Sequence, residues 1–292
     1  MPDFRKPDTH RMMLSVSLFR LWSHFLHRLT AWNTGGEGIH SPYLFYLVRH
    51  LMYDRNAYYC WKDIEDVRRC MLADTNMVDV TDFGTGQGRP AQRRICDIAR
   101  TSLEKPKNAQ LLFRWLGYLA REKQGACLNV VELGTSLGIT TAYLTAANNR
   151  LRVLTFDGSE AIAAVAQTNW QRLGLAERIE TVVGNLDSTL EPTLYNRAHA
   201  AREKGIGYSI DFAFLDANHT YDATMRYWKQ LLPYHGNKSI FVVDDIRYSP
   251  DMAKAWREIA QTECVTSTMD LGDMGIVFFD PQYLRRHYKL RY

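Results

Sequence analysis

The sequence predicts an α/β fold in which helices cover both faces of a doubly wound, mostly parallel sheet. Two observations carry this prediction. From residue 126 onward, short apolar segments alternate with segments of helical periodicity, and strand-helix alternation is typical of a parallel sheet. Before residue 126, apolar residues recur mostly at helical spacing, as in residues 111–119. We therefore expect a mainly helical N-terminal region, residues 1–125, followed by an α/β domain, residues 126–292.

Apolar segments and turn residues divide the α/β part into elements. Strands are expected at residues 127–133, 152–157, 178–184, 211–216 and 239–244. Helices are expected at residues 140–148, 160–173, 221–232 and 249–260. The end of the chain, residues 265–279, predicts an antiparallel hairpin that turns at Gly272 and Asp273. Ligands bind beyond the carboxyl ends of parallel strands, so the residues that follow each strand are the first candidates for a site.

The N-terminal region is too large to be a simple lid. Gly35, Gly36 and Gly38 separate its first helix from one that begins near Ser41 and Pro42. The region is also rich in aromatic side chains. We expect it to cover the site and select what enters, with a homodimer interface or plain core packing as alternatives.

Residues 12–32 are apolar, but Arg20, His24, His27 and Arg28 interrupt them. A membrane span needs about 18 or more consecutive apolar residues, which no part of the sequence provides. The pattern instead predicts an amphipathic helix. Packing on the protein itself is the favoured interpretation, and weak contact with a membrane surface is the alternative.

The overall charge is mild. Lys and Arg total 36 and Asp and Glu total 32, which leaves a net charge of +4. Nucleic-acid binding is therefore not favoured, because it calls for clustered basic residues. A short basic cluster near the C-terminus is interpreted as a solvated tail: Arg285, Arg286, His287, Lys289 and Arg291. The five cysteines include no pair with the spacing of a zinc or redox motif, which predicts reduced thiols and a cytoplasmic protein.

Two glycine-rich segments could hold a nucleotide, residues 82–88 and residues 132–138. Glycine lets the backbone approach a ligand because it has no Cβ. An acid that binds ribose is expected at the end of the next strand, roughly 20 residues further on. Asp157 stands in that place, 23 residues after Gly134, whereas the first segment is followed by a polar stretch without a strand. The second segment is the predicted cofactor site, and the Gly84–Gly88 loop is a structural turn or lies near the substrate.

The second segment has glycines four residues apart and an acid two residues before the first glycine. Its sequence VELGTSLG, residues 131–138, resembles the first motif of the class I S-adenosyl-L-methionine-dependent methyltransferases. Asp157 matches their second motif, residues 184–187 resemble the third, and residues 211–216 resemble the fourth. The closing hairpin resembles their antiparallel seventh strand. The resemblance covers about residues 126–281 and implies a Rossmann-like domain that binds S-adenosyl-L-methionine.

The resemblance also implies roles for individual residues. Glu132 would fix the methionine amino group, with a helix-capping role as the alternative. Thr140 would meet the methionine carboxylate at a helix N-terminus, Asp157 would bind the ribose, and residues 185–187 would flank the adenine. The implied cofactor-binding residues are Glu132, Gly134, Thr135, Ser136, Gly138, Thr140, Asp157, Asn185, Leu186, Asp187 and Asp216.

The fourth motif bears on which atom receives the methyl group. Methyltransferases that act on exocyclic amines or glutamine usually carry an Asn-Pro-Pro-aromatic sequence there, and this chain has DANHTY at residues 216–221. A Pro-Cys nucleophile for cytosine is also absent from the sequence. Methylation of oxygen is therefore the better interpretation.

Three acidic residues lie at the ends of two neighbouring predicted strands, Asp216 at the end of one and Asp244 and Asp245 at the end of the next. Neighbouring strands lie ~4.8 Å apart, so these carboxylates can converge on a hard divalent ion such as Mg²⁺. Asp244 and Asp245 can both be ligands only if the chain turns at residue 245, because consecutive strand residues point to opposite faces. Such an ion lowers the pKa of a bound hydroxyl, and His219 could take the proton. His219 and Asp216 are thus the candidate catalytic residues, with a helix cap and a simple substrate contact as their alternatives.

This arrangement resembles catechol O-methyltransferases, although Asp245 stands where that family has Asn. It is more similar to the macrocin O-methyltransferases, which pair an Asp-x-x-His sequence with two consecutive acids. The leading hypothesis is metal-assisted methyl transfer to a hydroxyl of a small molecule. The alternatives are a metal-free methyltransferase for another acceptor, including nucleic acid, and a methyltransferase-like scaffold without catalysis.

Overall fold

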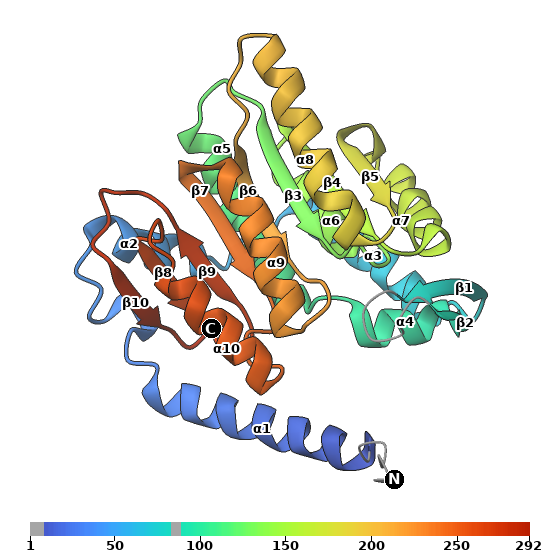
Figure 1. The fold of residues 1–292 in the computed structure, drawn as a ribbon, viewed down its shortest axis with the longest axis horizontal. Helices are drawn as coiled ribbons and strands as arrows, with labels where there is room; N and C mark the ends of the chain where they lie inside the picture. Colours follow the sequence, from blue (N-terminus) through green and yellow to red (C-terminus); the bar gives the residue numbers. More distant parts are fainter. Residues whose placement is uncertain (1–8, 83–88) are drawn as a thin grey trace, which may run out of the picture.

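An eight-stranded sheet forms the centre of the protein in the computed structural model, which describes residues 9–82 and 89–292 (Figure 1). Its strands are β3 (Leu128–Leu133), β4 (Leu151–Asp157), β5 (Ile179–Val183), β6 (Ile210–Leu215), β7 (His235–Val243), β8 (Ser267–Asp270), β9 (Gly275–Phe278) and β10 (Arg286–Lys289). They lie in the order β10-β8-β9-β7-β6-β3-β4-β5. Strands β3 to β7 are parallel, and β9 is antiparallel to β7 and β8. The predicted α/β class, a mostly parallel sheet with an antiparallel C-terminal hairpin, is confirmed.

Helices from both parts of the chain cover the sheet. One face carries α2 (Pro42–Leu47), the π-helical turn η2 (Val48–Met52) and α5 (Pro106–Glu122). The other face carries α8 (Leu186–Glu203), α9 (Tyr221–Leu231) and α10 (Pro250–Gln261). A third group packs around Trp170 and consists of α3 (Tyr59–Ala73), α6 (Ile139–Ala146) and α7 (Glu160–Arg172). The chain also forms three short 3₁₀ turns in the described residues: η1 (Thr34–Gly36), η3 (Ala176–Arg178) and η4 (Leu232–Tyr234).

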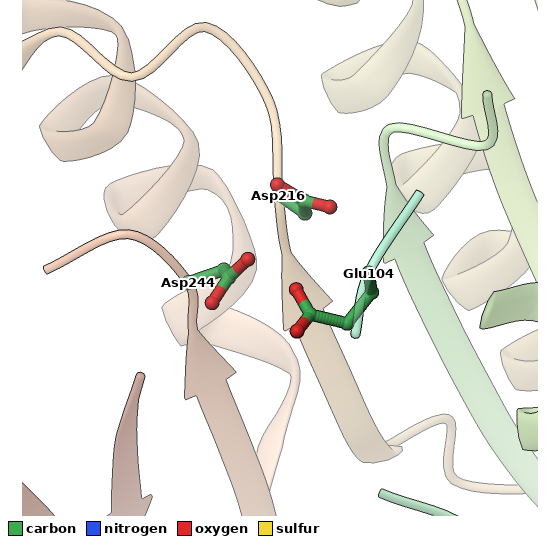
Figure 2. A group of neighbouring side chains, drawn as sticks. All are labelled: Glu104, Asp216 and Asp244. Carbon is green, nitrogen blue, oxygen red and sulfur yellow. The ribbon is translucent and has the colours of Figure 1, made fainter. Parts of the chain in front are cut away.

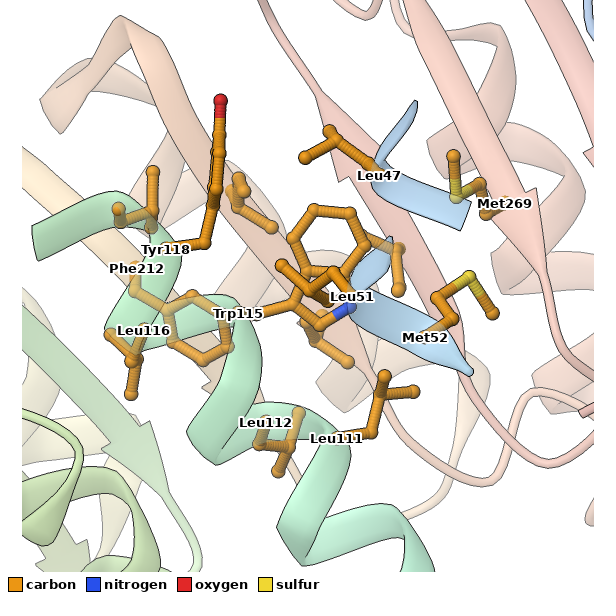
Figure 3. Packing of buried hydrophobic residues seen from close by; sticks show 14 of the residues in the cluster. Leu47, Leu51, Met52, Leu111, Leu112, Trp115, Leu116, Tyr118, Phe212 and Met269 are labelled. Carbon is orange, nitrogen blue, oxygen red and sulfur yellow. The ribbon is translucent and has the colours of Figure 1, made fainter. Parts of the chain in front are cut away.

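Alternate residues of the central strands face opposite clusters, as the two-residue period of a strand requires. In β3, Leu128 and Val130 belong to the cluster under α2 and α5, while Val131 and Leu133 belong to the cluster under α8 to α10. Figure 3 shows the first cluster, in which the Trp115 ring of α5 lies among side chains of η2 and the sheet. Residues from both sides of position 125 share this core, and the domain boundary proposed there stays a prediction.

The N-terminal region also contains a two-stranded antiparallel sheet, β1 (Met77–Asp82) and β2 (Arg89–Arg94), followed by α4 (Ile95–Ser102). The two strands flank the Gly84–Gly88 loop, and that loop lies outside the described residues. Ser159 after β4 reaches this sheet, because its hydroxyl donates to the Asp79 carbonyl at 3.4 Å. The small sheet therefore lies beside the carboxyl end of β4.

Helix α8 and strand β10 have no counterpart in the sequence prediction. Helix α8 escaped it because its sequence is mostly polar, contains Pro192 and buries mainly Leu190 and Leu194. Strand β10 lies within the basic C-terminal cluster, where the alternation of Tyr288 and Leu290 with charged residues is short. These two side chains are buried and β10 pairs with β8, so the backbone of this segment forms the edge of the sheet. The basic side chains of the cluster are exposed.

Helix α1 (Thr9–Thr30) is long and lies along one side of the molecule, below α10 in Figure 1. It touches the loop after β8, where His27 Nε2 is 3.2 Å from Asp270 Oδ1 and His24 Nε2 is 3.3 Å from Asp273 Oδ1. Across the described residues, no helix combines the length and the apolar character that crossing a membrane requires.

Candidate active site

A cavity of about 800 Å³ opens at the carboxyl ends of the central strands. Gly134 follows β3, Asp157 ends β4, Asn185 follows β5, and Asp216 and Asp244 follow β6 and β7. The N-terminal region closes the other side with residues from α1, the small sheet, α4 and the α4–α5 connection. The cavity is thus at the edge where a parallel sheet binds its ligands.

The loop after β3 depends on glycine at two positions. Gly134 has a φ of 102°, and a Cβ there would collide with the backbone carbonyl of Asp216. Gly138 has a φ of 78°, and its Cβ would lie 2.5 Å from Nε1 of Trp170. Residues with a side chain rarely adopt such φ values, so the backbone conformation at both positions requires glycine. The loop can pass close to the end of β6 and then begin α6.

Asp157 is held by the same loop. Its Oδ2 accepts from the Ser136 amide at 2.9 Å, and its Oδ1 accepts from the Ser159 amide at 2.8 Å. Burial raises the pKa of Asp157 to about 6, although these two amides lower it in part. Both oxygens can still accept further hydrogen bonds, and Asp157 lines the cavity. This geometry suits a partner with two hydroxyl groups.

Glu132 lies beneath the loop and is completely buried. The hydroxyls of Thr141 and Thr155 donate to its Oε2 at 2.5 and 2.6 Å, whereas its Oε1 has no partner among the described residues. Burial raises the pKa of Glu132 to about 8, against the two hydroxyls. A buried carboxyl oxygen without a donor is costly, and Glu132 is not part of the cavity lining.

The other predicted cofactor residues divide into two groups. Ser136, Asn185 and Leu186 line the cavity, and Thr135, Gly138, Thr140 and Asp187 are not part of its lining. Asp187 faces α9 instead, where Arg226 and Tyr227 donate to its Oδ1 at 2.7 and 3.1 Å.

Three carboxylates converge in the cavity: Glu104, Asp216 and Asp244. One oxygen of each lies within 4.8 Å of the others, and Figure 2 shows the side chains pointing toward a common centre. Burial raises the pKa of Asp216 and of Asp244 well above the usual value, and the neighbouring acids raise both further. Oδ1 of Asp244 has no partner among the described residues. We name these three residues the carboxylate cluster.

Local structure fixes each member of the cluster. The Asp216 amide donates to the Leu133 carbonyl and the Asp244 amide donates to the Leu215 carbonyl, both at 2.9 Å, so adjacent strand ends are held in step. Glu104 comes from the connection before α5. Its Oε1 accepts from the amide of Lys105 at 2.9 Å and from the Asn108 side chain at 2.6 Å. The first turn of α5 therefore aims Glu104 at the strand ends.

Asp245 lies outside the carboxylate cluster. The chain does turn at this residue, which has a φ of 52°. The turn directs its Oδ2 to within 3.7 Å of His219 Nδ1 and its Oδ1 to within 3.8 Å of Arg20. The carboxylates that converge are thus Glu104, Asp216 and Asp244, whereas Asp245 faces a histidine. The metal set of Asp216, Asp244 and Asp245 stays a prediction.

His219 lies between the carboxylate cluster and Asp245. Its Nε2 is 3.6 Å from Asp216 Oδ1, and its Nδ1 faces Asp245. Burial lowers the pKa of His219, Asp245 raises it, and Arg20 lowers it further. A neutral imidazole is therefore favoured at neutral pH, which is the form that can accept a proton.

Sequence reasoning missed Glu104 as a member of the site. It belongs to the N-terminal region, far from Asp216 and Asp244 in the chain, in a polar stretch just before Pro106. Proline at the first position of a helix is a start signal, and it would have placed Glu104 at the entry of α5. No sequence pattern says which strand ends that entry faces.

Comparison with known proteins agrees with this geometry. Residues 131–246 match the family model of a methyltransferase domain, and this range runs from the second half of β3 to just past β7 and contains every predicted site residue. The part of the chain that supplies the strand ends of the cavity is therefore similar to a methyltransferase domain.

Individual relatives match over limited lengths. The catechol O-methyltransferase of Mycobacterium tuberculosis is 34% identical over 118 residues, which are 40% of this chain and 47% of that protein. The match thus spans about half of the relative. A crystal structure of the O-methyltransferase TomG from Streptomyces achromogenes, involved in tomaymycin synthesis and in complex with S-adenosylmethionine, is 19% identical with a TM-score of 0.49, over 61% of this chain and 82% of that chain. An O-methyltransferase from Bacillus cereus in complex with S-adenosylhomocysteine is 16% identical with a TM-score of 0.49, over 77% and 93%.

Proposed function

We propose that this protein transfers a methyl group from S-adenosyl-L-methionine to a hydroxyl of a small molecule, assisted by a divalent cation such as Mg²⁺. The observation that carries the proposal is the position of the carboxylate cluster. It lies in the same cavity as Asp157 and the loop after β3 that contains Gly134, which we name the Gly134 loop. His219 lies beside it. A cofactor pocket, a set of hard oxygen ligands and a base are thus adjacent.

The carboxylate cluster fits a divalent cation by its own chemistry. Buried carboxylates in mutual contact repel one another and raise each other's pKa, as at Asp216 and Asp244. Oxygen ligands from carboxylates are those that Mg²⁺ and Ca²⁺ prefer, and Oδ1 of Asp244 is a buried acceptor without a donor among the described residues. Glu104, Asp216 and Asp244 would hold the ion. When bound, such an ion lowers the pKa of a coordinated hydroxyl and orients it.

The residues of the chain have separate tasks in this proposal. Asp157 accepts from the ribose hydroxyls, and the Gly134 loop lets the backbone approach the cofactor. His219 accepts the proton that the acceptor hydroxyl loses as its oxygen takes the methyl group. Asp245 faces the opposite ring nitrogen of His219 at 3.7 Å, which favours an imidazole directed toward Asp216. In an in-line displacement, such positioning is a large part of the catalysis.

The N-terminal region supplies the remaining wall of the cavity in this proposal. Arg20 of α1 and Tyr248 lie near His219, with the Arg20 guanidinium 5.6 Å from the Tyr248 ring centre. Lys105 and Asn108 contribute from the start of α5. The acceptor would therefore contact both parts of the chain, which supports a role of residues 1–125 in acceptor selection.

Radiolabelled S-adenosylmethionine, incubated with the protein and a panel of catechols, phenols and sugars, tests the proposal. We expect label transfer to a hydroxyl that requires Mg²⁺ and stops with EDTA. Asp157→Ala should abolish it. Asp251→Asn is the matched control, because Asp251 is exposed in the first turn of α10 and does not line the cavity, and it should retain activity.

Each other outcome removes a different part of the proposal. Transfer that EDTA leaves unchanged would refute the role of the cation. If amines are added to the panel, label that reaches an amine and no hydroxyl would refute oxygen methylation. Failure to bind S-adenosylmethionine in calorimetry would leave a methyltransferase-like scaffold.

A further inference from the structure

We propose that α1 and the basic C-terminal segment form a docking surface for an anionic lipid bilayer. This surface is separate from methyl transfer and goes beyond the proposed function. We define the apolar face of α1 as the outward side chains Leu18, Leu21, Trp22, Phe25, Leu26 and Leu29, which Trp32 extends past the helix end.

The apolar face is turned to solvent. Its side chains are between 41% and 78% exposed, with Trp22 at 60% and Trp32 at 78%. They recur at the three- and four-residue spacing of one helix side. A helix of a globular protein normally turns such a stripe toward the core, so α1 has the reverse orientation. A contiguous exposed patch of this kind marks an interaction site.

Polar contacts hold α1 in this orientation. His27 is buried against Asp270, His24 faces Asp273, and Arg20 faces Asp245. All three side chains lie on the side of the helix opposite the apolar face. Rolling the helix to bury its leucines would remove His27 from its buried contact with Asp270. The exposure of the apolar face therefore follows from how α1 is attached.

Basic side chains adjoin the C-terminal end of α1. The Asn33 amide donates to the Lys289 carbonyl at 3.0 Å, the Lys289 amide donates to Asn33 Oδ1 at 3.1 Å, and Arg291 Nε donates to the Arg28 carbonyl at 2.9 Å. These bonds fix β10 beside the end of the helix. The basic side chains gathered there are exposed: Arg28, Arg285, Arg286, Lys289 and Arg291. None of them forms an ion pair with a carboxylate that the structure describes.

An anionic bilayer matches both features. Amphipathic helices that lie in a membrane interface combine Trp, Phe and Leu on one face with adjacent Lys and Arg. Each basic residue near an anionic surface contributes about 1 kcal/mol. A second copy of this chain matches less well, because a two-fold interface over α1 brings the same surface from both subunits together. It would also bring two uncompensated basic segments toward each other.

Vesicle sedimentation tests this surface without methyl transfer. The full-length protein is mixed with vesicles of phosphatidylglycerol and phosphatidylcholine in equal parts, or of phosphatidylcholine alone. We expect the protein to sediment with the first and not the second. The double variant Trp22→Ser, Phe25→Ser should bind about ten-fold more weakly or not at all. Arg286→Glu with Lys289→Glu should weaken binding, and high salt should do the same.

The control variant is Tyr195→Ser with Ile206→Ser. These side chains are 61% and 62% exposed and lie in or just after α8, far from α1 in Figure 1. The control should bind vesicles as the parent does. Thermal unfolding of each variant establishes that it is folded, and Leu29→Ser replaces the first pair if that pair lowers the melting temperature.

Three results would overturn the proposal. The first is no sedimentation with either vesicle. The second is binding that Trp22→Ser with Phe25→Ser leaves unchanged. The third is a dimer, seen by light scattering, that this variant converts to monomers, because a second copy would then cover the apolar face.

Discussion

Asp244 and Asp245 are consecutive in the chain, yet their carboxyl groups serve different parts of the cavity. Asp244 directly follows β7, and its carboxyl group faces Asp216 and Glu104. Asp245 has a φ of 52°, which turns its side chain to His219 and Arg20. The two residues can therefore be separated by substitution although they are neighbours.

Asp244→Asn is expected to weaken binding of Mn²⁺ or Mg²⁺ by about ten-fold or more, because it removes a charged ligand from the carboxylate cluster. Glu104→Gln should have the same effect, since Glu104 completes the cluster. Asp245→Asn is the matched control and should leave metal affinity nearly unchanged. Calorimetric titration measures all three. A loss confined to Asp245→Asn would show that the ion sits elsewhere.

The candidate site could be predicted from the sequence only where it follows strand ends. Asp157 ends a buried strand, and Asp216 and Asp244 each come directly after one. Parallel strands bring such positions to one edge. Glu104 follows a helix, and its place depends on how α5 packs against the sheet. The direction of Asp245 depends on a single backbone angle that aspartate adopts uncommonly. Residue spacing indicates neither the packing of α5 nor the backbone angle at Asp245.

The fold was predictable in its apolar, regular parts. Strands β3, β4, β6 and β7 have buried apolar segments, and the turn after β8 carries the expected Gly272. Helix α8 is polar on most of its surface, so its stability comes from packing rather than from a clear periodicity. Strand β10 is recognised only through its pairing with β8, which is a tertiary contact.

Cofactor affinity should rise with pH through about 6. Burial raises the pKa of Asp157 to about 6, and the ionised carboxylate is the form that accepts from both ribose hydroxyls. Below that pH the protonated carboxyl loses acceptor capacity, so S-adenosylhomocysteine should bind more weakly. Calorimetry at several pH values between about 5 and about 8 measures the change, because this range brackets the raised pKa of Asp157. Asp157→Asn should bind weakly at every pH, and a pH dependence that persisted in this variant would point to another group.

Gly134→Ala should cost more stability than Gly174→Ala. Both glycines have positive φ, so both substitutions strain the backbone by about 1 kcal/mol. At Gly134 the new Cβ also meets the Asp216 carbonyl, whereas nothing lies within 4 Å at Gly174. The collision adds about 1–3 kcal/mol. Urea denaturation compares the two variants. Equal losses would mean that the loop relaxes without cost.

The ion pair of Asp270 should make stability depend on pH in the acid range. Burial would raise the pKa of Asp270, but the hydrogen bonds of His27 and Arg247 lower it from 3.8 to about 2. A lowered acid pKa adds stability that is complete above the unfolded value of 3.8 and is lost as the pH falls toward 2. Asp270→Asn should therefore cost about 2 kcal/mol at neutral pH. The difference in unfolding free energy between Asp270→Asn and the parent protein should disappear as the pH falls below about 4.

Asp97→Asn is the control for this comparison. Asp97 pairs with Arg100 at 2.9 Å on the surface, where both side chains are more than half exposed. Exposed pairs contribute about 0.2–1 kcal/mol, so this variant should unfold nearly like the parent. An Asp270→Asn variant that also unfolded like the parent at neutral pH would contradict the proposed role of the buried pair.

His219→Ala should lower the turnover number about 100-fold, the usual contribution of a positioned base, and leave cofactor affinity unchanged. His219 touches the acids at Asp216 and Asp245, while the cofactor loop and Asp157 are held by other contacts. His199→Ala is the matched control, because His199 lies on α8, is 56% exposed and faces Glu203. Steady-state kinetics and calorimetry separate the two effects. Parent-like turnover in His219→Ala would remove the imidazole from the reaction, and a matching loss of cofactor affinity would instead assign it to binding.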